Sequence, residues 1–569
     1  MMKLNLKWQV LLAVLAIGLV VALVLLRQRP ADVSGVVVSG VAPAADCGTP
    51  SPVSGGVFVE GMVGAPRFLN PLLSDPYPVD REIVDLLFDG LTRYDAEGNL
   101  VPALAESWSV SEDGRTVRFT LRPDAVWHDG EPVTAEDVAF TYSLMQDEAF
   151  PGLSGLKLLW QAVTIRQEDE RTIVFELDEP YAPFLEATTR GILPAHHLEG
   201  VTAASLPEAT INRQPVGTGP FMVAPDQDWQ RTHRLRLLPN PDYWAGGTQI
   251  DAVEIRFYPD ETSMLQALVD GELHGVNGIS PVALPVAASI PDLRLFTSPA
   301  PRYSALLFNL TDSGFTGLQD VSVRQALAYG LDRDLLVDRV LNGQAVPLEG
   351  PYLPVSWAYN PVLLTPYATN LISATTRLDE AGWILPEGQT VRQQDETLFQ
   401  VRLLALNQPT AQAVAAEIGR QWGEIGVAVL VETADSLTEF RQMLAERAFD
   451  VALVDIAPPV DPDLYDFWSQ EAIVRGQNYA GWNHQRASEA LEKGRQVWDV
   501  AERRPFYDTF LRFYMRELPA LTLYQQVYTY GMSNSVHNAE IGLVVRPRDR
   551  FATFADWFLL FREATTDCE

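Results

Sequence analysis

Cysteine is scarce in this sequence, because the 569 residues include only Cys47 and Cys568, one near each end. No C-x-x-C pair occurs, so neither a zinc site nor a thioredoxin-type redox site built on cysteines is expected. The two thiols either form a disulfide between the ends of the chain in an oxidising compartment, or stay free and unrelated to each other. The sequence leaves both alternatives open.

Positive charge is scarce as well. Lys and Arg together number 42 against 74 Asp and Glu, which gives a formal net charge of −32. A protein that binds nucleic acid needs clustered Lys and Arg to contact the phosphates, so no nucleic-acid partner is expected. The acidic excess suits a protein that stays soluble outside a cell.

The short motifs of common catalytic sites are missing. No H-E-x-x-H, G-x-S-x-G or P-loop pattern occurs, and the S-x-x-K match at residues 154–157 lacks its companion S-D-N and K-T-G motifs. His196 and His197 are interpreted as structural rather than as metal ligands, because adjacent side chains point in different directions on a strand or helix. We therefore expect no enzyme activity, no cofactor and no metal site.

A long apolar run without charge, Trp8–Leu26, lies near the N-terminus between basic residues. As a helix it would span roughly 28 Å, close to the ~30 Å thickness of a bilayer core. It is longer than the core of a secretory signal and no small-residue cleavage site follows it. We expect an uncleaved membrane anchor that holds the remainder of the chain outside the cytoplasm. Residues 30–56, rich in Gly, Pro, Ser and Ala, are expected to form a flexible linker.

The rest of the chain is too long for one hydrophobic core, so two or three lobes are expected. Alternating apolar residues predict half-buried strands at 115–122, 171–180 and 251–260. Residues 397–457 then show the order strand, helix, strand, helix, strand, which predicts a parallel sheet with helices packed on it. The five segments are 397–407, 410–426, 426–432, 436–447 and 449–457, and Ser436 with Glu439 forms a capping box before the second helix.

The stretch WHDGEPVTAEDVAFTYSLM, residues 127–145, places one histidine and four acidic residues close together. Such a set is either a His–carboxylate site or a structural motif. Thr134 stands where a helix N-cap is expected, and Asp137, three residues later, can complete a capping box. Glu136 and Asp137 also fall in the first turn, where the helix dipole favours anions. We favour the structural interpretation and predict a helix that begins after Thr134.

The same stretch resembles the signature of the family 5 extracellular solute-binding proteins, the oligopeptide-, dipeptide- and nickel-binding receptors of ABC importers. The resemblance covers roughly residues 57 to 560, and further blocks follow in the family's order. They include ILPAHHL (192–198), VGTGPF (216–221), NPDYWAGGTQIDAVEIRFYPD (240–260), VRQALAYGLDRDLLVDRVLNGQAVPLEGPYLP (323–354), DPDLYDFW (461–468) and NYAGWN (478–483).

The resemblance implies an α/β, two-lobed, periplasmic-binding-protein-like (type II) fold with an extra β-rich subdomain, preceded here by one transmembrane helix. In such a fold the ligand lies in a cleft and hinge closure buries it. The expected organisation is a cytoplasmic tip and anchor (1–29, helix 8–26), a linker (30–56), lobe I (57–98, 212–300 and 527–569), an inserted subdomain of lobe I (99–211) and lobe II (301–526).

The resemblance also implies where ligand contacts lie. Peptide receptors of this family anchor the free amine of the peptide on an Asp that precedes a (Glu/Asp)-Pro pair. Here Asp461-Pro462 matches the pair, but Pro458-Pro459 occupies the anchor position, so Asp455 or Asp461 is expected to substitute. The other expected contacts are Tyr303, Asn309, Trp468, Asn478 and Tyr479, and for each of them packing in the core or at the surface is the alternative.

The expected function is that of a monomeric receptor that captures a peptide-like ligand and delivers it to an ABC permease without covalent chemistry. Within the same fold, an oligosaccharide, an opine or a metal chelate is an alternative ligand. A ligand-sensing module for a membrane partner is a further alternative. A hydrolase or transferase on a two-lobed scaffold is not favoured, because no local motif supplies a nucleophile and its base.

Overall fold

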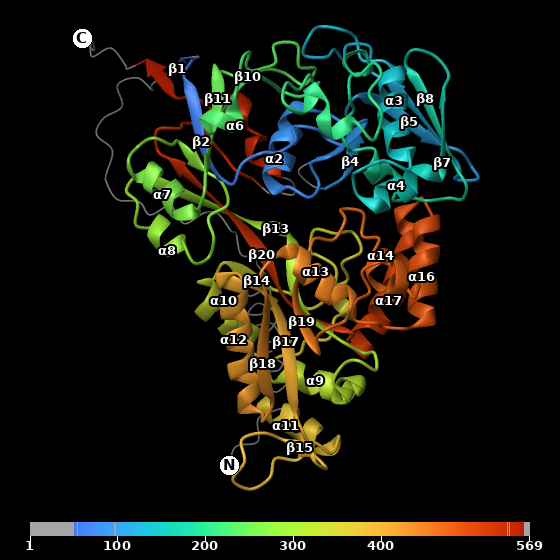
Figure 1. Cartoon of the computed structure of the whole chain (residues 1–569), viewed down its shortest axis with the longest axis vertical. Coiled ribbons are helices and arrows are strands. Elements are labelled where there is room, and N and C mark those ends of the chain that lie inside the picture. The colour runs from blue at the N-terminus through green and yellow to red at the C-terminus, as the bar shows by residue number, and fades with distance from the viewer. Residues whose placement is uncertain (1–50, 54, 96–97, 543, 545–546, 563–569) are drawn as a thin grey trace, which may run out of the picture. The chain divides into compact units, whose positions relative to one another are not determined.

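The computed structural model describes residues 51–562 except residues 54, 96–97, 543 and 545–546 (Figure 1). The expected anchor Trp8–Leu26, most of the linker, Cys47 and Cys568 lie outside these described residues. Among the helices that the structure describes, none combines the length and the apolar character that crossing a membrane requires.

The largest sheet has eleven strands in the order β18-β17-β19-β13-β20-β12-β2-β11-β10-β9, with β14 paired to β20 beside this path. Its strands are β2 (Val57–Val63), β9 (Phe221–Val223), β10 (Arg234–Pro239), β11 (Ala252–Tyr258), β12 (Gly275–Val276), β13 (Leu293–Phe308), β14 (Ala345–Pro347), β17 (Gln400–Leu406), β18 (Ala428–Ala434), β19 (Val451–Ile456) and β20 (Ala520–Ser533). The strand predicted at 251–260 is confirmed as β11.

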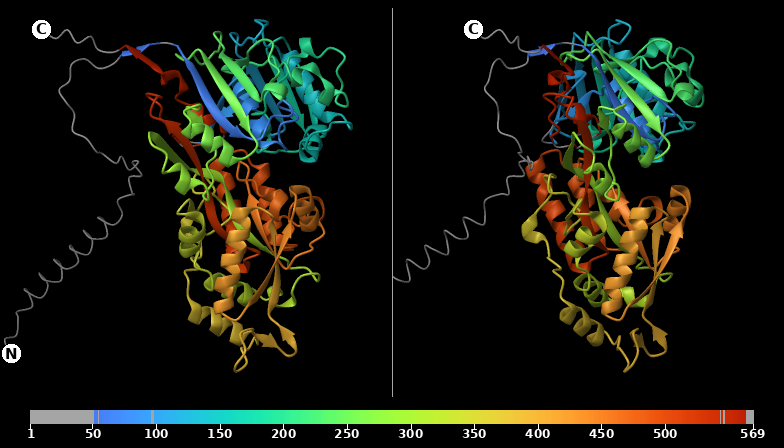
Figure 2. Two further views of the ribbon diagram at one scale, coloured as in Figure 1. Left: turned by 60° about the vertical axis from the view of Figure 1, so that its left-hand side comes forward. Right: turned by 90° about the vertical axis from the view of Figure 1, so that its left-hand side faces the viewer.

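The strands β13 and β20 are long, antiparallel partners that run between the two halves of the described chain (Figure 2). One large buried cluster takes its residues from 303–524, and a second takes them from 58–257 and 530–557. The first cluster is the core of lobe II and the second that of lobe I, so the two-lobed α/β fold is confirmed. The expected boundaries at residues 300/301 and 526/527 lie within the two long strands and stay a prediction.

Lobe I carries a separate four-stranded antiparallel sheet, β5 (Ala105–Val110), β6 (Thr116–Leu121), β8 (Thr172–Leu177) and β7 (Val163–Gln167), in this order. The strands predicted at 115–122 and 171–180 are confirmed as β6 and β8. The helices α3 (Ala135–Gln146) and α4 (Ser154–Gln161) pack with it, and the rings of Tyr142 and Trp160 stack with centroids 4.0 Å apart. This sheet lies within the predicted inserted subdomain, residues 99–211.

Lobe II contains the predicted strand-helix-strand-helix-strand unit. Strand β17 pairs in parallel with β18 and with β19, and the intervening helices are α12 (Pro409–Glu424) and α13 (Leu437–Ala445). The Ser436 hydroxyl accepts a hydrogen bond from the backbone N–H of Glu439 at 3.1 Å, which confirms the predicted N-cap. The order of elements in this segment is therefore as the sequence pattern predicts.

The remaining elements complete the two lobes. The helices are α2 (Pro78–Leu87), α5 (Phe184–Ala187), α6 (Trp229–Thr232), α7 (Glu261–Val269), α8 (Leu284–Ala287), α9 (Val321–Tyr329), α10 (Arg333–Leu341), α11 (Leu371–Glu380), α14 (Tyr465–Trp468), α15 (Ala472–Arg475), α16 (Gln485–Gln496) and α17 (Val500–Glu517). The strands of the small two-stranded sheets are β1 (Ser51–Val53), β3 (Thr92–Tyr94), β4 (Leu100–Pro102), β15 (Gln393–Gln394), β16 (Thr397–Leu398) and β21 (Leu560–Arg562).

A buried ion-pair network, which we call the lobe I network, ties the first strand of lobe I to its C-terminal segment. The guanidinium of Arg550 donates to both carboxylate oxygens of Glu60, at 2.9 and 3.0 Å, and both side chains are fully buried. Tyr530 of β20 donates its hydroxyl to Glu60 at 2.8 Å, and Glu82 of α2 lies 3.4 Å from Arg550. These residues are distant in sequence, so the network fixes how the ends of the lobe meet.

Candidate ligand-binding site

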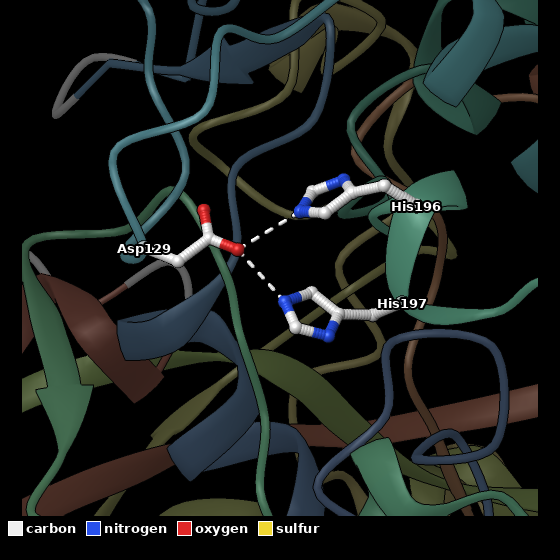
Figure 3. Close-up of side chains that lie close together, drawn as sticks. All are labelled: Asp129, His196 and His197. Atoms are coloured by element: carbon white, nitrogen blue, oxygen red, sulfur yellow. Dashed lines mark hydrogen bonds and ion pairs between the residues drawn. The ribbon is translucent and has the colours of Figure 1, made fainter.

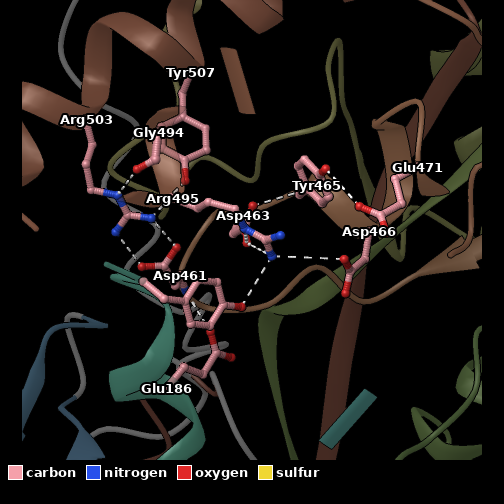
Figure 4. A network of polar contacts seen from close by, with 11 residues as sticks. Glu186, Asp461, Asp463, Tyr465, Asp466, Glu471, Gly494, Arg495, Arg503 and Tyr507 are labelled. Carbon is pink, nitrogen blue, oxygen red and sulfur yellow. Dashed lines mark hydrogen bonds and ion pairs between the residues drawn. The ribbon is translucent and has the colours of Figure 1, made fainter. Parts of the chain in front are cut away.

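A proline-rich loop of lobe II, residues 458–463, lies where several charged side chains meet (Figure 4). Asp461 of this loop forms a two-point ion pair with Arg503 of α17, with N–O distances of 2.6 and 2.7 Å. The side chain of Arg503 is only 3% exposed, and it also donates to the hydroxyl of Tyr507 at 2.8 Å. Two-point guanidinium–carboxylate bonds fix both position and orientation, so the loop is held firmly on α17.

A second ion pair follows directly in the same loop. The carboxylate of Asp463 accepts from Nε and Nη2 of Arg495, at 3.0 and 2.7 Å. Burial raises the pKa of Asp463, and the neighbouring Arg495 opposes this rise. The guanidinium of Arg495 also lies over the ring of Tyr465, 4.2 Å from its centroid, and over that of Tyr181, at 4.8 Å.

Glu186 of α5, in the inserted subdomain, reaches the same loop of lobe II. Its carboxylate accepts from the backbone N–H groups of Val460 and Asp461, at 3.1 and 3.0 Å. Burial and the nearby Asp461 carboxylate raise the pKa of Glu186 to about 7. We call the set Glu186, Asp461, Asp463, Arg495 and Arg503 the clasp, because it joins the subdomain to lobe II.

Backbone contacts reinforce the clasp. The N–H of Ala182 donates to the carbonyl of Arg495 at 2.8 Å, and the indole N–H of Trp498 donates to the carbonyl of Gly114 at 3.1 Å. The inserted subdomain therefore contacts both the end of α16 and the segment between α16 and α17.

A pocket lies beside the clasp. It is bounded by Gly98 of lobe I and by three segments at 301, 352–357 and 458–462. Its lining residues are Gly98, Pro301, Tyr352, Leu353, Val355, Ser356, Trp357, Pro458, Pro459, Val460 and Pro462. The guanidinium of Arg503 lies 5.0 Å from the centre of the Trp357 ring, so the clasp also orients one aromatic wall of the pocket.

Within the stretch 127–145, the helix predicted to begin after Thr134 is confirmed as α3, and Asp137 has the capping role that the sequence predicts. The Asp137 carboxylate accepts from the backbone N–H of Thr134 at 2.9 Å, as in a capping box, and from the N–H of Ala195 at 2.9 Å. The ring of half-buried His128 accepts from the N–H of Gly217 through Nδ1, at 3.0 Å. Burial lowers the pKa of His128 to about 4, so the ring is neutral and braces the 217–219 turn.

Asp129, His196 and His197 meet at one point on the surface of the inserted subdomain (Figure 3). Both Nε2 atoms point to Oδ2 of Asp129, at 2.9 Å from His196 and 2.7 Å from His197. The expectation that the two rings point apart is therefore wrong, because hydrogen bonding to one carboxylate turns both rings the same way. One carboxylate oxygen and two imidazole nitrogens lie within 4.8 Å of one another. Zinc, copper and nickel ions bind donor atoms of these kinds.

The comparison with known proteins decides the family. The sequence model for "Bacterial extracellular solute-binding proteins, family 5 Middle" matches residues 99–473. The chain belongs to this family.

Two curated relatives of this solute-binding protein match over most of their length. The oligopeptide-binding protein AppA of Bacillus subtilis (strain 168) is 27% identical over 512 residues, which cover 86% of this chain and 92% of AppA. Protein XP55 of Streptomyces lividans is 31% identical over 504 residues, which cover 84% and 87% of the two chains.

The fold of this solute-binding protein is similar to that of a solved relative. The structure of the Bacillus subtilis oligopeptide-binding protein AppA in complex with a nonapeptide superposes with a TM-score of 0.72. The alignment covers 90% of this chain and 100% of that chain at 24% sequence identity, which establishes a shared fold.

Four of the seven expected ligand contacts of this solute-binding protein lie inside lobe II. Tyr303, Asn309, Trp468 and Asn478 are each at most 3% exposed. The side-chain amide of Asn309 donates to the carbonyl of Phe449 at 2.9 Å, and that of Asn478 donates to the carbonyls of Ser469 and Trp482. Both amides hold neighbouring loops together, and the role of these four residues as ligand contacts stays a prediction.

The other three expected contacts are more accessible. Asp455 is exposed on β19 and accepts from the hydroxyl of Ser304 at 2.6 Å. Asp461 belongs to the clasp, and Tyr479 is half-buried against the core of lobe II. None of the seven lines the pocket beside the clasp, although Asp461 lies between two lining residues.

Of the clasp, sequence reasoning found Asp461 alone, and it did not find the aromatic residues of the pocket. Glu186 and Asp461 are 275 residues apart, and no local pattern marks such a contact. The one local signal was the cluster of prolines beside Asp461, where the family pattern places an acidic anchor.

Proposed function

We propose that this protein is the extracytoplasmic receptor of an ABC importer and that it captures a peptide-like solute beside the clasp. The observation that carries the proposal is the pocket whose walls come from lobe I, at Gly98, and from lobe II, at 352–357 and 458–462. Solute sites commonly lie where two domains meet, since domain closure then buries the ligand. Relatives named as oligopeptide- and dipeptide-binding proteins support a peptide-like ligand.

The proposal includes capture and release without covalent chemistry. The acidic groups of the clasp are engaged by Arg495, Arg503 and backbone N–H groups, as expected for a structure that positions two lobes. Binding shifts the population of lobe arrangements, and the permease then recognises the ligand-bound arrangement.

We also propose that Trp8–Leu26 tethers the receptor, as a monomer, to the outer face of the cell membrane. The length and apolar character of this run support the tether. Deletion of residues 8–26 should move the protein from the membrane fraction to the soluble fraction without changing its circular dichroism spectrum. A deleted protein that still sediments with membranes would contradict the tether.

The test of the function is native mass spectrometry of the full chain, purified in a mild detergent and exposed to a mixed pool of short peptides. Added masses that resolve into peptides on denaturation would support a peptide receptor. A protein that stays unshifted in the pool, and that releases no peptide when denatured as purified, would contradict it.

A further inference from the structure

The wall of the pocket beside the clasp is apolar and poor in hydrogen-bond donors. Four prolines line it: Pro301, Pro458, Pro459 and Pro462. Proline has no backbone N–H, so these positions cannot donate to a ligand carboxylate. Tyr352 and Trp357 add aromatic surface. A wall of this composition favours a small apolar group over a negatively charged one.

Three carboxylates lie beside the pocket, and each already has partners within the protein. Asp461 is paired with Arg503, Asp463 is paired with Arg495, and Glu186 accepts from two backbone N–H groups. A ligand ammonium group that took Asp461 would leave the guanidinium of Arg503, 3% exposed, without its carboxylate. Leaving a buried charge without its partner is strongly unfavourable, so the pocket disfavours a free ammonium group.

One buried polar group of the wall lacks a partner among the described residues. The hydroxyl of Tyr352 is buried and has no hydrogen-bond partner among the described residues. A buried hydroxyl without a partner is unfavourable, and a hydrogen bond to one acceptor on the ligand would remove this cost. A carbonyl oxygen is a suitable acceptor.

We infer that this pocket, with a volume of about 50 Å³, receives a small, uncharged apolar end of the solute with a carbonyl group beside it, as in an N-acetylated peptide. Tyr352 donates to the carbonyl, and the four prolines and Trp357 surround the apolar group. The inference rests on the proposed function and narrows its substrate class to solutes whose bound end carries no free amine.

The experiment compares a matched pair of peptides, Phe-Ala-Ala and N-acetyl-Phe-Ala-Ala, by isothermal titration calorimetry on the full chain in mild detergent. The acetylated peptide is expected to bind at least tenfold more tightly. Tyr352→Phe should weaken the acetylated peptide by about tenfold, the loss of one hydrogen bond. It should not lower the melting temperature, since the hydroxyl has no partner to lose within the described protein.

A second variant adds a carboxylate to the pocket wall and so tests whether the pocket disfavours a free ammonium group. Pro458→Asp places a carboxylate without an arginine partner at the pocket wall and is expected to improve binding of the free peptide relative to the acetylated one. Pro458→Asn, which removes the proline without adding charge, is the matched control and should keep the preference of the parent protein.

Two further results would overturn the inference while the proposed function stands. One is tighter binding of the free peptide, lost in Asp455→Asn, which would place the ammonium group on the exposed carboxylate of β19. The other is tight binding of the acetylated peptide that responds to neither Tyr352→Phe nor Pro458→Asp. Failure of both peptides and of the mixed pool would overturn the peptide function and the inference together.

Discussion

The lobe I network and the clasp are both built from arginine–carboxylate pairs, but they differ in what surrounds them. Arg550 and Glu60 are fully buried within one lobe. Arg503 is 3% exposed and Asp461 is 15% exposed, and their loop borders a pocket and contacts the inserted subdomain. The first network holds a core together, whereas the second adjoins a pocket.

The largest expected effect concerns the lobe I network. Arg550→Met leaves the buried carboxylate of Glu60 without its guanidinium and should lower the free energy of unfolding by about 3–5 kcal/mol. Urea denaturation followed by tryptophan fluorescence measures the change. Arg231→Met, at an exposed pair with Asp228, is the control and should change little. If the Arg550→Met protein is as stable as the parent, the network does not stabilise lobe I.

The clasp should be less sensitive, because water reaches part of Asp461. Arg503→Met is expected to cost about 2–3 kcal/mol in the same denaturation experiment, less than the change at Arg550. It should also improve binding of Phe-Ala-Ala, since Asp461 loses its partner. The double variant Asp461→Asn/Arg503→Met should recover part of the stability, because no charge is left alone. If Arg503→Met and Arg550→Met lower the free energy of unfolding equally, the clasp and the lobe I network do not differ in their contribution to stability.

The clasp should also respond to pH. The pKa of Glu186 is about 7 in the folded protein and near 4.5 when the chain is unfolded, so the folded state binds more protons between these values. The free energy of unfolding should therefore fall by on the order of 1–3 kcal/mol as pH rises from 5 to 8. Thermal unfolding at a series of pH values measures it. Glu186→Gln should flatten this pH dependence, and an unchanged slope in that variant would exclude Glu186 as its source.

The smallest expected effect is at the surface of the inserted subdomain. Asp129→Asn weakens the two hydrogen bonds from His196 and His197 and should cost about 0.5–1 kcal/mol, because all three residues contact water. Differential scanning calorimetry measures the shift in melting temperature. Glu208→Gln, at an exposed acid of the same subdomain, is the control. If Asp129→Asn lowers the stability more than Arg503→Met does, the expected order of these two effects is wrong.

The parts of the fold that local patterns specify were predictable. Period-2 alternation located β6, β8 and β11, and capping chemistry located the start of α3 at Thr134 and of α13 at Ser436. These features depend on residues within a few positions of one another, so a single sequence carries the information. The strand-helix-strand-helix-strand unit of lobe II was predictable for the same reason, because its elements follow one another directly in the sequence.

The site was less predictable, because it depends on contacts between distant segments. Asp461 was singled out by its family motif, but nothing in the sequence pairs it with Arg503 or brings Glu186 to its backbone. The convergence of His196 and His197 on Asp129 was missed because spacing along a chain says little about rings that bend toward a shared acceptor. Tertiary packing, and not local propensity, sets all of these contacts.

The path of the chain through β13 and β20 also has a consequence for the order of folding. The core of lobe II comes from one continuous stretch, residues 303–524, whereas that of lobe I needs Tyr530, Phe551 and Trp557 from the last part of the chain. A polypeptide that emerges N-terminus first can assemble lobe II before its synthesis or export is complete, but it cannot close the core of lobe I. The first half of the chain must therefore wait, with part of its apolar surface exposed, until the C-terminal segment arrives.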